Sequence, residues 1–171
     1  WAAATERAVR LDQVGSALTG RRFTFAIGKL VLWSPRSDLV DGDGDVLHSG
    51  GFRRLAIANP DLAPYGQAAI QVMEALGLDQ RLTDRLVRGE NIAQAFQFVY
   101  SGNAELGFVA RSQLRGAGMG GSAWIVPQVH YRPIEQQAVL LTDTRAGHEF
   151  MVFMRGEQAK RLIREHGYGT P

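Results

Sequence analysis

Cysteine is absent from this sequence, and lysine occurs only at Lys29 and Lys160 among 19 lysine and arginine residues. The lack of cysteine excludes disulfide bonds, thiolate metal ligands and a cysteine nucleophile. No apolar run reaches the length of about 18 residues that a membrane-spanning helix needs, so we predict none. Acidic residues number 17, and the net charge of +2 is too small to indicate nucleic acid as a partner.

The first residues lack two features that often open a chain. Trp1 stands where an initiator methionine would be, and no basic stretch followed by an apolar stretch comes after it. We therefore expect no signal peptide in this chain, and we interpret the chain as a processed product or a fragment.

The composition that is present is that of an ordinary globular protein. The chain has 171 residues, of which 45% are hydrophobic and 21% charged, and this length predicts one domain or two small lobes. Strands alternate with helices of about 10–12 residues, a pattern typical of an α/β fold with a largely parallel sheet. The expected strands are 23–33 with a bend at Gly28, 53–58, 86–87, 106–110, 124–127 and 134–141. The expected helices are 5–14 capped by Thr5, 64–76, 92–100, 146–155 and 157–166, with a turn at Thr19-Gly20.

No group of residues has the pattern of a catalytic or metal site. Asp41, Asp43 and Asp45 have the opening spacing of a calcium loop, but Phe52 stands where the bidentate glutamate belongs, which favours a solvated hairpin loop. The four histidines never occur four residues apart, and the glycine-rich stretch 116–121 lacks the Lys-Ser/Thr pair of a phosphate-binding loop. We therefore expect no enzyme, no cofactor and no direct protein ligand to a metal.

Two helix starts are the informative feature. One lies at Pro64-Tyr65-Gly66 and the other at Asn91-Ile92, where Asn91 has the residue type of an N-cap. Both follow predicted strands, so both helix N-termini should lie at the carboxyl edge of the sheet, where backbone N–H groups can bind an oxyanion. Any pair of strand-to-helix turns would show this pattern, so the spacing alone leaves open an anion site and two ordinary helix starts.

Several segments resemble the periplasmic molybdate-binding proteins of ABC transporters. They follow the order and spacing of that family across nearly the whole chain, and they are residues 23–34, 57–66, 89–94, 102–109, 133–141 and the terminal Gly167-Tyr168. The resemblance implies an α/β fold of the type-two periplasmic-binding-protein class, with two α/β lobes joined by crossover strands and the anion bound between them.

The resemblance also implies how the chain is divided. Residues 30–130 would form the second lobe, while 1–29 and 131–171 would form the crossover strands and a remnant of the first lobe. The first lobe would be incomplete, because roughly the first quarter to third of a full binding protein has no counterpart here, and residues 1–4 would fall at the end of a first-lobe strand.

The function implied by the resemblance is capture of molybdate or tungstate in the periplasm for the membrane permease of an ABC transporter. Tyr65 and Ile92 would bind the oxyanion, so molybdenum would have no direct protein ligand. Ala110 stands where some family members have a tyrosine ligand, and the first-lobe ligands are missing. The alternative is a truncated remnant that acts as a non-transport interaction module without affinity for the anion. An anion-dependent enzyme is a third possibility, which the lack of a catalytic group disfavours.

An incomplete first lobe would also expose apolar side chains and a sheet edge. Phe25, Val139 and Leu141 are the expected exposed side chains. We predict self-association through this edge, strand swapping, or a partner that supplies the missing strands.

Overall fold

The computed structural model describes residues 22–171, and the chain divides into two compact units. Unit 2 consists of Lys29–Ile134, and unit 1 combines Glu135–Pro171 with the chain up to Gly28. The identification of these units with the two lobes of a binding protein stays a prediction. The helix predicted at 5–14, its cap Thr5 and the turn at Thr19-Gly20 lie outside the described residues.

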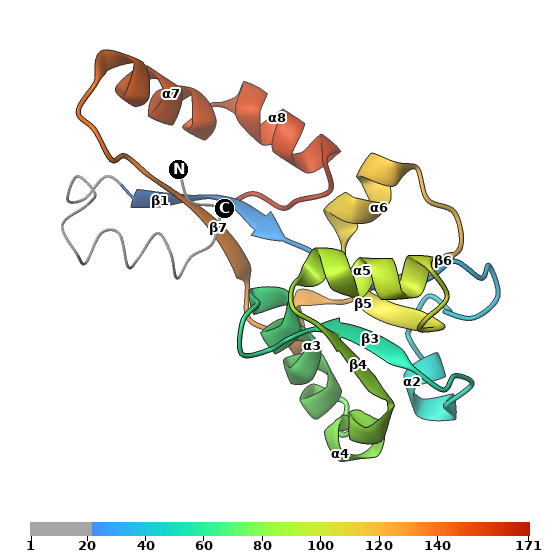
Figure 1. Ribbon diagram of the computed structural model, residues 1–171. Helices are drawn as coiled ribbons and strands as arrows, with labels where there is room; N and C mark the ends of the chain where they lie inside the picture. The colour runs from blue at the N-terminus through green and yellow to red at the C-terminus, as the bar shows by residue number, and fades with distance from the viewer. Residues whose placement is uncertain (1–21) are drawn as a thin grey trace. The chain divides into compact units, whose positions relative to one another are not determined.

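The described elements follow one another as strands and short helices (Figure 1). The strands are β1 (Arg22–Gly28), β2 (Leu30–Ser34), β3 (Leu55–Ala58), β4 (Leu86–Gly89), β5 (Leu106–Ala110), β6 (Ser122–Ile125) and β7 (Ile134–Val139). The α-helices are α2 (Val46–Ser49), α3 (Pro64–Ala75), α4 (Asp79–Leu82), α5 (Ile92–Tyr100), α6 (Arg111–Ala117), α7 (Arg145–Arg155) and α8 (Glu157–Glu165). Two single turns of 3₁₀ helix, η1 (Thr83–Arg85) and η2 (Gln128–His130), complete the set.

The sheet of unit 2 has five strands in the order β4-β3-β5-β2-β6. β3 pairs in parallel with β4 and β5, whereas β2 pairs antiparallel with β5 and β6. The prediction of a largely parallel sheet is therefore wrong, because half of the strand pairs are antiparallel. β2 lies between β5 and β6, which are distant in the sequence and run in the opposite direction, so no local pattern indicates the direction of β2 in the sheet. The predicted run 23–33 is divided directly after Gly28.

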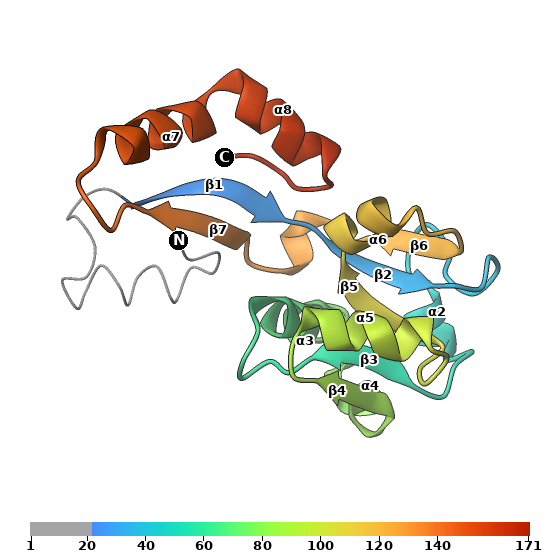
Figure 2. The ribbon, with the colours of Figure 1, turned by 45° about the horizontal axis from the view of Figure 1, so that its top comes forward.

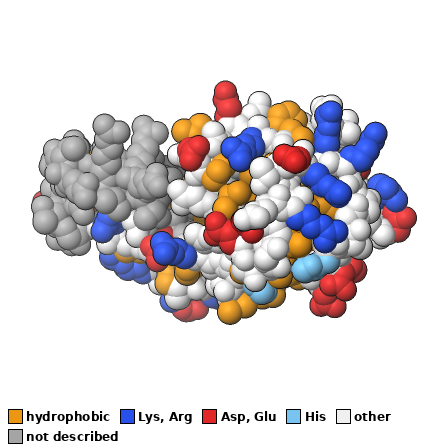
Figure 3. Space-filling view, turned by 90° about the horizontal axis from the view of Figure 1, so that it is seen from below, with side chains coloured by type: hydrophobic (Ala, Val, Ile, Leu, Met, Phe, Trp, Pro, Cys, Tyr) orange, Lys and Arg blue, Asp and Glu red, His pale blue; other side chains and the backbone are white. Residues whose placement is uncertain are grey.

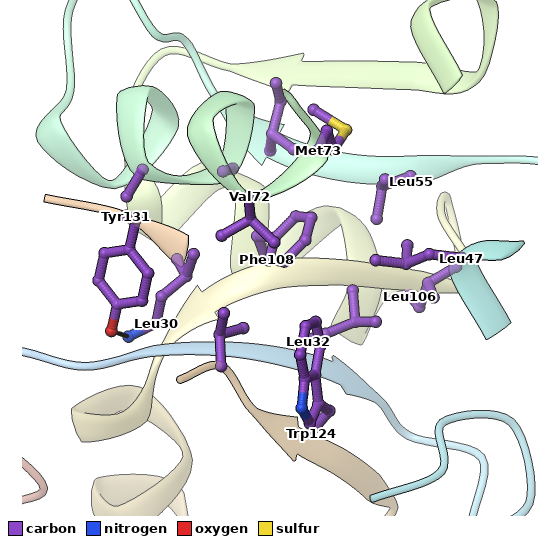
Figure 4. Close-up of a cluster of buried hydrophobic side chains, with 14 of the residues drawn as sticks. Leu30, Leu32, Leu47, Leu55, Val72, Met73, Leu106, Phe108, Trp124 and Tyr131 are labelled. Carbon is purple, nitrogen blue, oxygen red and sulfur yellow. Dashed lines mark hydrogen bonds between the residues drawn. The ribbon is translucent and has the colours of Figure 1, made fainter. Parts of the chain in front are cut away.

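Helices cover both faces of this sheet, as the α/β prediction requires. Successive residues of a strand point to opposite faces, so Leu32 belongs to one core and Val31 to the other. The larger core lies on the α3 side (Figure 4), and its fully buried members include Leu30, Leu32, Leu47, Leu55, Val72, Met73, Leu106 and Phe108. The smaller core lies on the α5 side and consists of Val31, Trp33, Ala56, Val99, Ala104 and Val109.

Tyr131 closes the larger core where β2 begins. Its ring is buried, and its hydroxyl oxygen accepts the N–H of Leu30 at 3.1 Å (Figure 4). Burial raises the pKa of the Tyr131 phenol above its ordinary value, although the hydrogen bond from Leu30 opposes this effect. The phenol therefore stays neutral throughout the physiological pH range and can keep this contact.

Unit 1 has far less sheet to cover. β1 and β7 form a two-stranded sheet, and α7 and α8 lie over one face of it (Figure 2). A small core joins Ala138, Leu140 and Met151, with the half-buried Phe23 and Phe25 packed against it. Ile27 and Gly169 exchange two backbone hydrogen bonds of 2.8 and 2.7 Å, which tie the end of β1 to the residues after α8.

The predicted exposure of apolar residues in unit 1 holds for one residue out of three. Leu141 is 43% exposed, but Phe25 is half-buried and Val139 is only 5% exposed. The expectation of an exposed Val139 is therefore wrong, because this strand position is covered rather than left open. Further apolar side chains are exposed on α7, including Phe150 and Val152.

The sequence patterns did not predict the short helices α2 and α6 of unit 2. α6 begins directly after β5 and includes the first two residues of the glycine-rich stretch 116–121. The aspartate-rich loop at 41–45 is stabilised by the Asp41 carboxylate, which accepts the N–H groups of Asp43 and Asp45 at 3.1 and 2.9 Å. This loop leads into α2 and is not the turn of a hairpin, so that part of the expectation is wrong.

Basic and acidic side chains are mixed on the face shown in Figure 3, with apolar side chains between them. Between residues 22 and 171, no helix has the length and apolar character that crossing a bilayer requires. The same residues contain no group of three or more histidine or acidic side chains placed to hold a metal ion.

Candidate functional site

The turn between β3 and α3 places Tyr65 at the carboxyl edge of the sheet. Asn59 organises this turn: its side-chain oxygen accepts the N–H of Asp61 at 3.0 Å, and its carbonyl oxygen accepts the N–H groups of Leu62 and Ala63. α3 then begins at Pro64, which carries no N–H, so Tyr65 is the first residue of the helix with a backbone donor.

Gly66 fixes how closely α3 approaches this turn. A Cβ atom at position 66 would lie 2.3 Å from the carbonyl oxygen of Ala58, and 2.8 Å from backbone atoms of Asn59 and Pro60. Only glycine fits there, because the neighbouring atoms are backbone and cannot move aside as a flexible side chain would. The first turn of α3, and with it Tyr65, is therefore held in contact with the end of β3.

The turn between β4 and α5 is organised by side-chain hydrogen bonds. The side-chain oxygen of Asn91 accepts the N–H groups of Ala93 and Gln94, each at 3.0 Å, which confirms the prediction of Asn91 as the N-cap. The side-chain oxygen of Gln94 in turn accepts the N–H of Glu90 at 2.6 Å. These bonds occupy two of the three amides in the first turn of α5, and they leave the N–H of Ile92 for an outside acceptor.

The two turns are neighbours. Ala58 of β3 pairs with Gly89 of β4, and the N–H of Asn59 donates to the carbonyl oxygen of Gly89 at 2.6 Å. The structure thus places the two predicted site residues, Tyr65 and Ile92, on adjacent turns at one edge of the sheet. What binds there is not tested by this geometry, so their role stays a prediction.

The side chains of these two residues belong to the core rather than to the surface. Tyr65 is 9% exposed and belongs to the larger core, and the half-buried Ile92 packs against the same cluster. Their packing fixes the position of the backbone, and the backbone N–H is the group with which each residue would bind an anion.

The charge around the two helix starts is favourable for an anion. Neither α3 nor α5 has an acidic residue in its first turn. Carboxylates are common at such positions because they stabilise the positive end of the helix dipole. The first turns themselves therefore place no carboxylate against the partial positive charge of either helix N-terminus.

A third strand-to-helix turn, between β5 and α6, lies at the same edge of the sheet. The sequence analysis did not predict it. Ala110, the position at which some family members carry a tyrosine, is the N-cap of α6, and its N–H donates to the side-chain oxygen of Gln113 at 2.9 Å. The side-chain amide of Gln113 also donates to the carbonyl oxygen of Ile92 at 3.1 Å. A glutamine three residues after the end of a strand is the available sequence signal for such a helix start.

Comparisons with known proteins agree with this architecture. Residues 1–169 match the family of bacterial extracellular solute-binding proteins. The chain is 48% identical over 165 residues to the molybdate-binding protein ModA of Azotobacter vinelandii, an alignment that covers 94% of this chain and 66% of that protein. It is 46% identical over 159 residues to ModA of Rhodobacter capsulatus, covering 91% of this chain and 62% of that protein.

A solved structure shows the same likeness. The periplasmic molybdate-binding protein of Azotobacter vinelandii superposes on this chain with a TM-score of 0.88 and 44% sequence identity, covering 99% of this chain and 76% of that one. The chain spans 66% and 62% of the length of the two curated relatives described above, slightly less than two thirds.

Proposed function

Because this chain belongs to the family of bacterial extracellular solute-binding proteins, we propose that it binds molybdate as an intact oxyanion and acts as the solute-binding component of an ABC transporter. The observation that carries the proposal is the 48% identity to a molybdate-binding protein along 94% of this chain. Both the binding of molybdate and the role in transport are proposals for this chain, because the alignment covers only 66% of that relative.

The two adjacent helix starts support an oxyanion as the ligand. The N–H groups of Tyr65 and Ile92 are neutral donors at the positive ends of α3 and α5, and such donors bind oxyanions without a formal countercharge. A buried lysine or arginine would have to be desolvated together with the anion, and that cost is avoided here. We therefore expect no lysine or arginine to contact the anion directly, and tungstate, with its similar charge and shape, to compete with molybdate.

The remaining parts of the proposal follow from the family. The partner would be the membrane permease of the transporter, and the location would be the periplasm. No cofactor or catalysis enters this function, since the oxyanion is released unchanged. Self-association through the edge of the β1–β7 sheet stays a prediction, and light scattering that finds only monomer at high concentration would contradict it.

Isothermal titration calorimetry of the 171-residue chain with molybdate tests the proposal. We expect saturable binding of one anion per chain, competition by tungstate, and much weaker binding of sulfate and phosphate, which serve as the matched ligand controls. Absence of any binding heat at millimolar molybdate would contradict the proposal and favour the alternative of a remnant without anion affinity.

A further inference from the structure

The side chain of Gln113 connects two strand-to-helix turns that are not neighbours in the sheet. β5 and β4 lie on either side of β3, and α6 and α5 follow them. The Gln113 side chain accepts the N–H of Ala110 at 2.9 Å on its own turn and donates to the carbonyl oxygen of Ile92 at 3.1 Å on the other. Gln113 therefore links the turns that follow β5 and β4, the two strands on either side of β3.

The residue that Gln113 contacts is the one whose N–H remains available on α5. The amides of Ala93 and Gln94 donate to Asn91, and the amide of Glu90 donates to Gln94. Because a single donor of this turn would face the anion, the direction of the Ile92 N–H decides how well the turn binds. The N–H and C=O of one residue are coupled through its two backbone dihedrals, so a bond that holds the carbonyl restrains the N–H as well.

We propose that Gln113 is a positioning residue that fixes the backbone of Ile92 for anion binding, an inference that rests on the proposed function. Its bond to Ala110 is accounted for by capping of α6, but its bond to Ile92 is not, since α6 has no need of an acceptor 21 residues away in the sequence. The carboxamide suits the task because it accepts at one end, donates at the other and adds no charge beside the anion.

Two substitutions separate the two bonds of Gln113. Gln113→Glu keeps an acceptor for the N–H of Ala110 but removes the donor to Ile92. Gln113→Met removes both bonds and adds no charge. Gln97 is an exposed glutamine on α5, so Gln97→Glu and Gln97→Met are matched controls.

The first measurement is the affinity of each full-length variant for molybdate by calorimetry, with the melting temperature recorded alongside. We expect both Gln113 variants to weaken binding by about tenfold, as loss of one well-placed hydrogen bond allows. Both Gln97 variants should stay within twofold of the wild type. Gln113→Met binding within twofold of the wild type would overturn the inference, as would a loss of affinity confined to the charged Gln113→Glu.

The second measurement needs no ligand. The amide nitrogen of Ala93 is bonded to the Ile92 carbonyl, so its ¹⁵N chemical shift reports on the hydrogen bond from Gln113. We expect this shift to change in both Gln113 variants and in neither Gln97 variant, and an unchanged shift would overturn the inference. Failure of the wild type to bind molybdate would instead contradict the proposed function, while the chemical shift of Ala93 still decides whether Gln113 holds the Ile92 carbonyl.

Discussion

The turns that begin α3 and α5 hold their first amides by different means. At α3 no side chain caps the helix, and the geometry comes from Pro64 and from the close contact of Gly66 with the backbone of the preceding turn. At α5 the geometry comes from hydrogen bonds of Asn91 and Gln94. A close steric contact fails when an atom is added, and a hydrogen-bonded cap fails when its side chain is removed. Added bulk should therefore disturb the α3 turn most, whereas the α5 turn should also respond to the loss of a side chain.

The largest effect is expected from Gly66→Ala. Its Cβ would lie 2.3 Å from the carbonyl oxygen of Ala58, so α3 must move away from β3. We expect a loss of about 3 kcal/mol in the free energy of unfolding, at the upper end of overpacking costs, together with a loss of molybdate affinity. Chemical denaturation and calorimetry measure the two quantities.

Gly42→Ala is the control for this substitution, because nothing lies within 4 Å of a Cβ at position 42. It should leave both quantities almost unchanged. If Gly66→Ala and Gly42→Ala had equal free energies of unfolding, the close contact at the start of α3 would contribute nothing to stability.

Gly89→Ala should have the next largest effect, and it tests whether the α5 turn also depends on close packing. A Cβ at position 89 would lie 2.7 Å from the amide nitrogen of Ala95 and 3.1 Å from Gln94. The overlap is smaller than at position 66, so we expect a loss of about 2 kcal/mol and a displaced Ile92 amide. Gly51→Ala, which meets nothing within 4 Å, is the control in the same denaturation series.

Asn91→Ala removes the side-chain cap of α5 without adding an atom. We expect a loss of about 1 kcal/mol in unfolding free energy, the typical value of an N-cap. The freed amides of Ala93 and Gln94 would then compete with Ile92 for the anion. Asn103→Ala, an exposed asparagine after the same helix, should change stability by much less in parallel thermal melts.

Asn91→Asp should give the smallest change in stability and a change of opposite sign in binding. The carboxylate keeps the acceptor for Ala93 and Gln94 and interacts favourably with the helix dipole, so stability should rise by about 0.5 kcal/mol at low salt. The same negative charge next to Ile92 should repel a dianion and weaken its binding. An affinity for molybdate that stays unchanged while stability rises would argue against an anion at this turn.

The elements that the sequence predicted well are those with strong local signals. α3 begins at Pro64 and α5 begins after its asparagine cap, as predicted. The structure adds that Gly77, just after α3, has the left-handed conformation. α2 and α6 were missed because four and seven residues give too little periodicity to recognise. The direction of β2 was missed because strand pairing is decided by tertiary contacts rather than by local sequence.

The residues of the candidate site also differ in whether a local sequence signal indicates them. The two helix starts could be predicted because each has a recognisable local pattern, and the resemblance to the family is what assigns Tyr65 and Ile92 to the anion. Gln113 could not, because its contact with Ile92 joins residues 21 positions apart in the sequence and exists only after the sheet has formed. A side chain that acts on the backbone of a distant residue carries no local signal of its partner.

A titration of the ¹⁵N-labelled chain with molybdate, followed by ¹H–¹⁵N correlation spectra, tests the central claim most directly. If α3 and α5 present their first amides to the anion, the Tyr65 and Ile92 resonances should show the largest shifts in unit 2, and these shifts should saturate with the calorimetric affinity. Saturable binding that leaves both resonances unchanged would contradict the account.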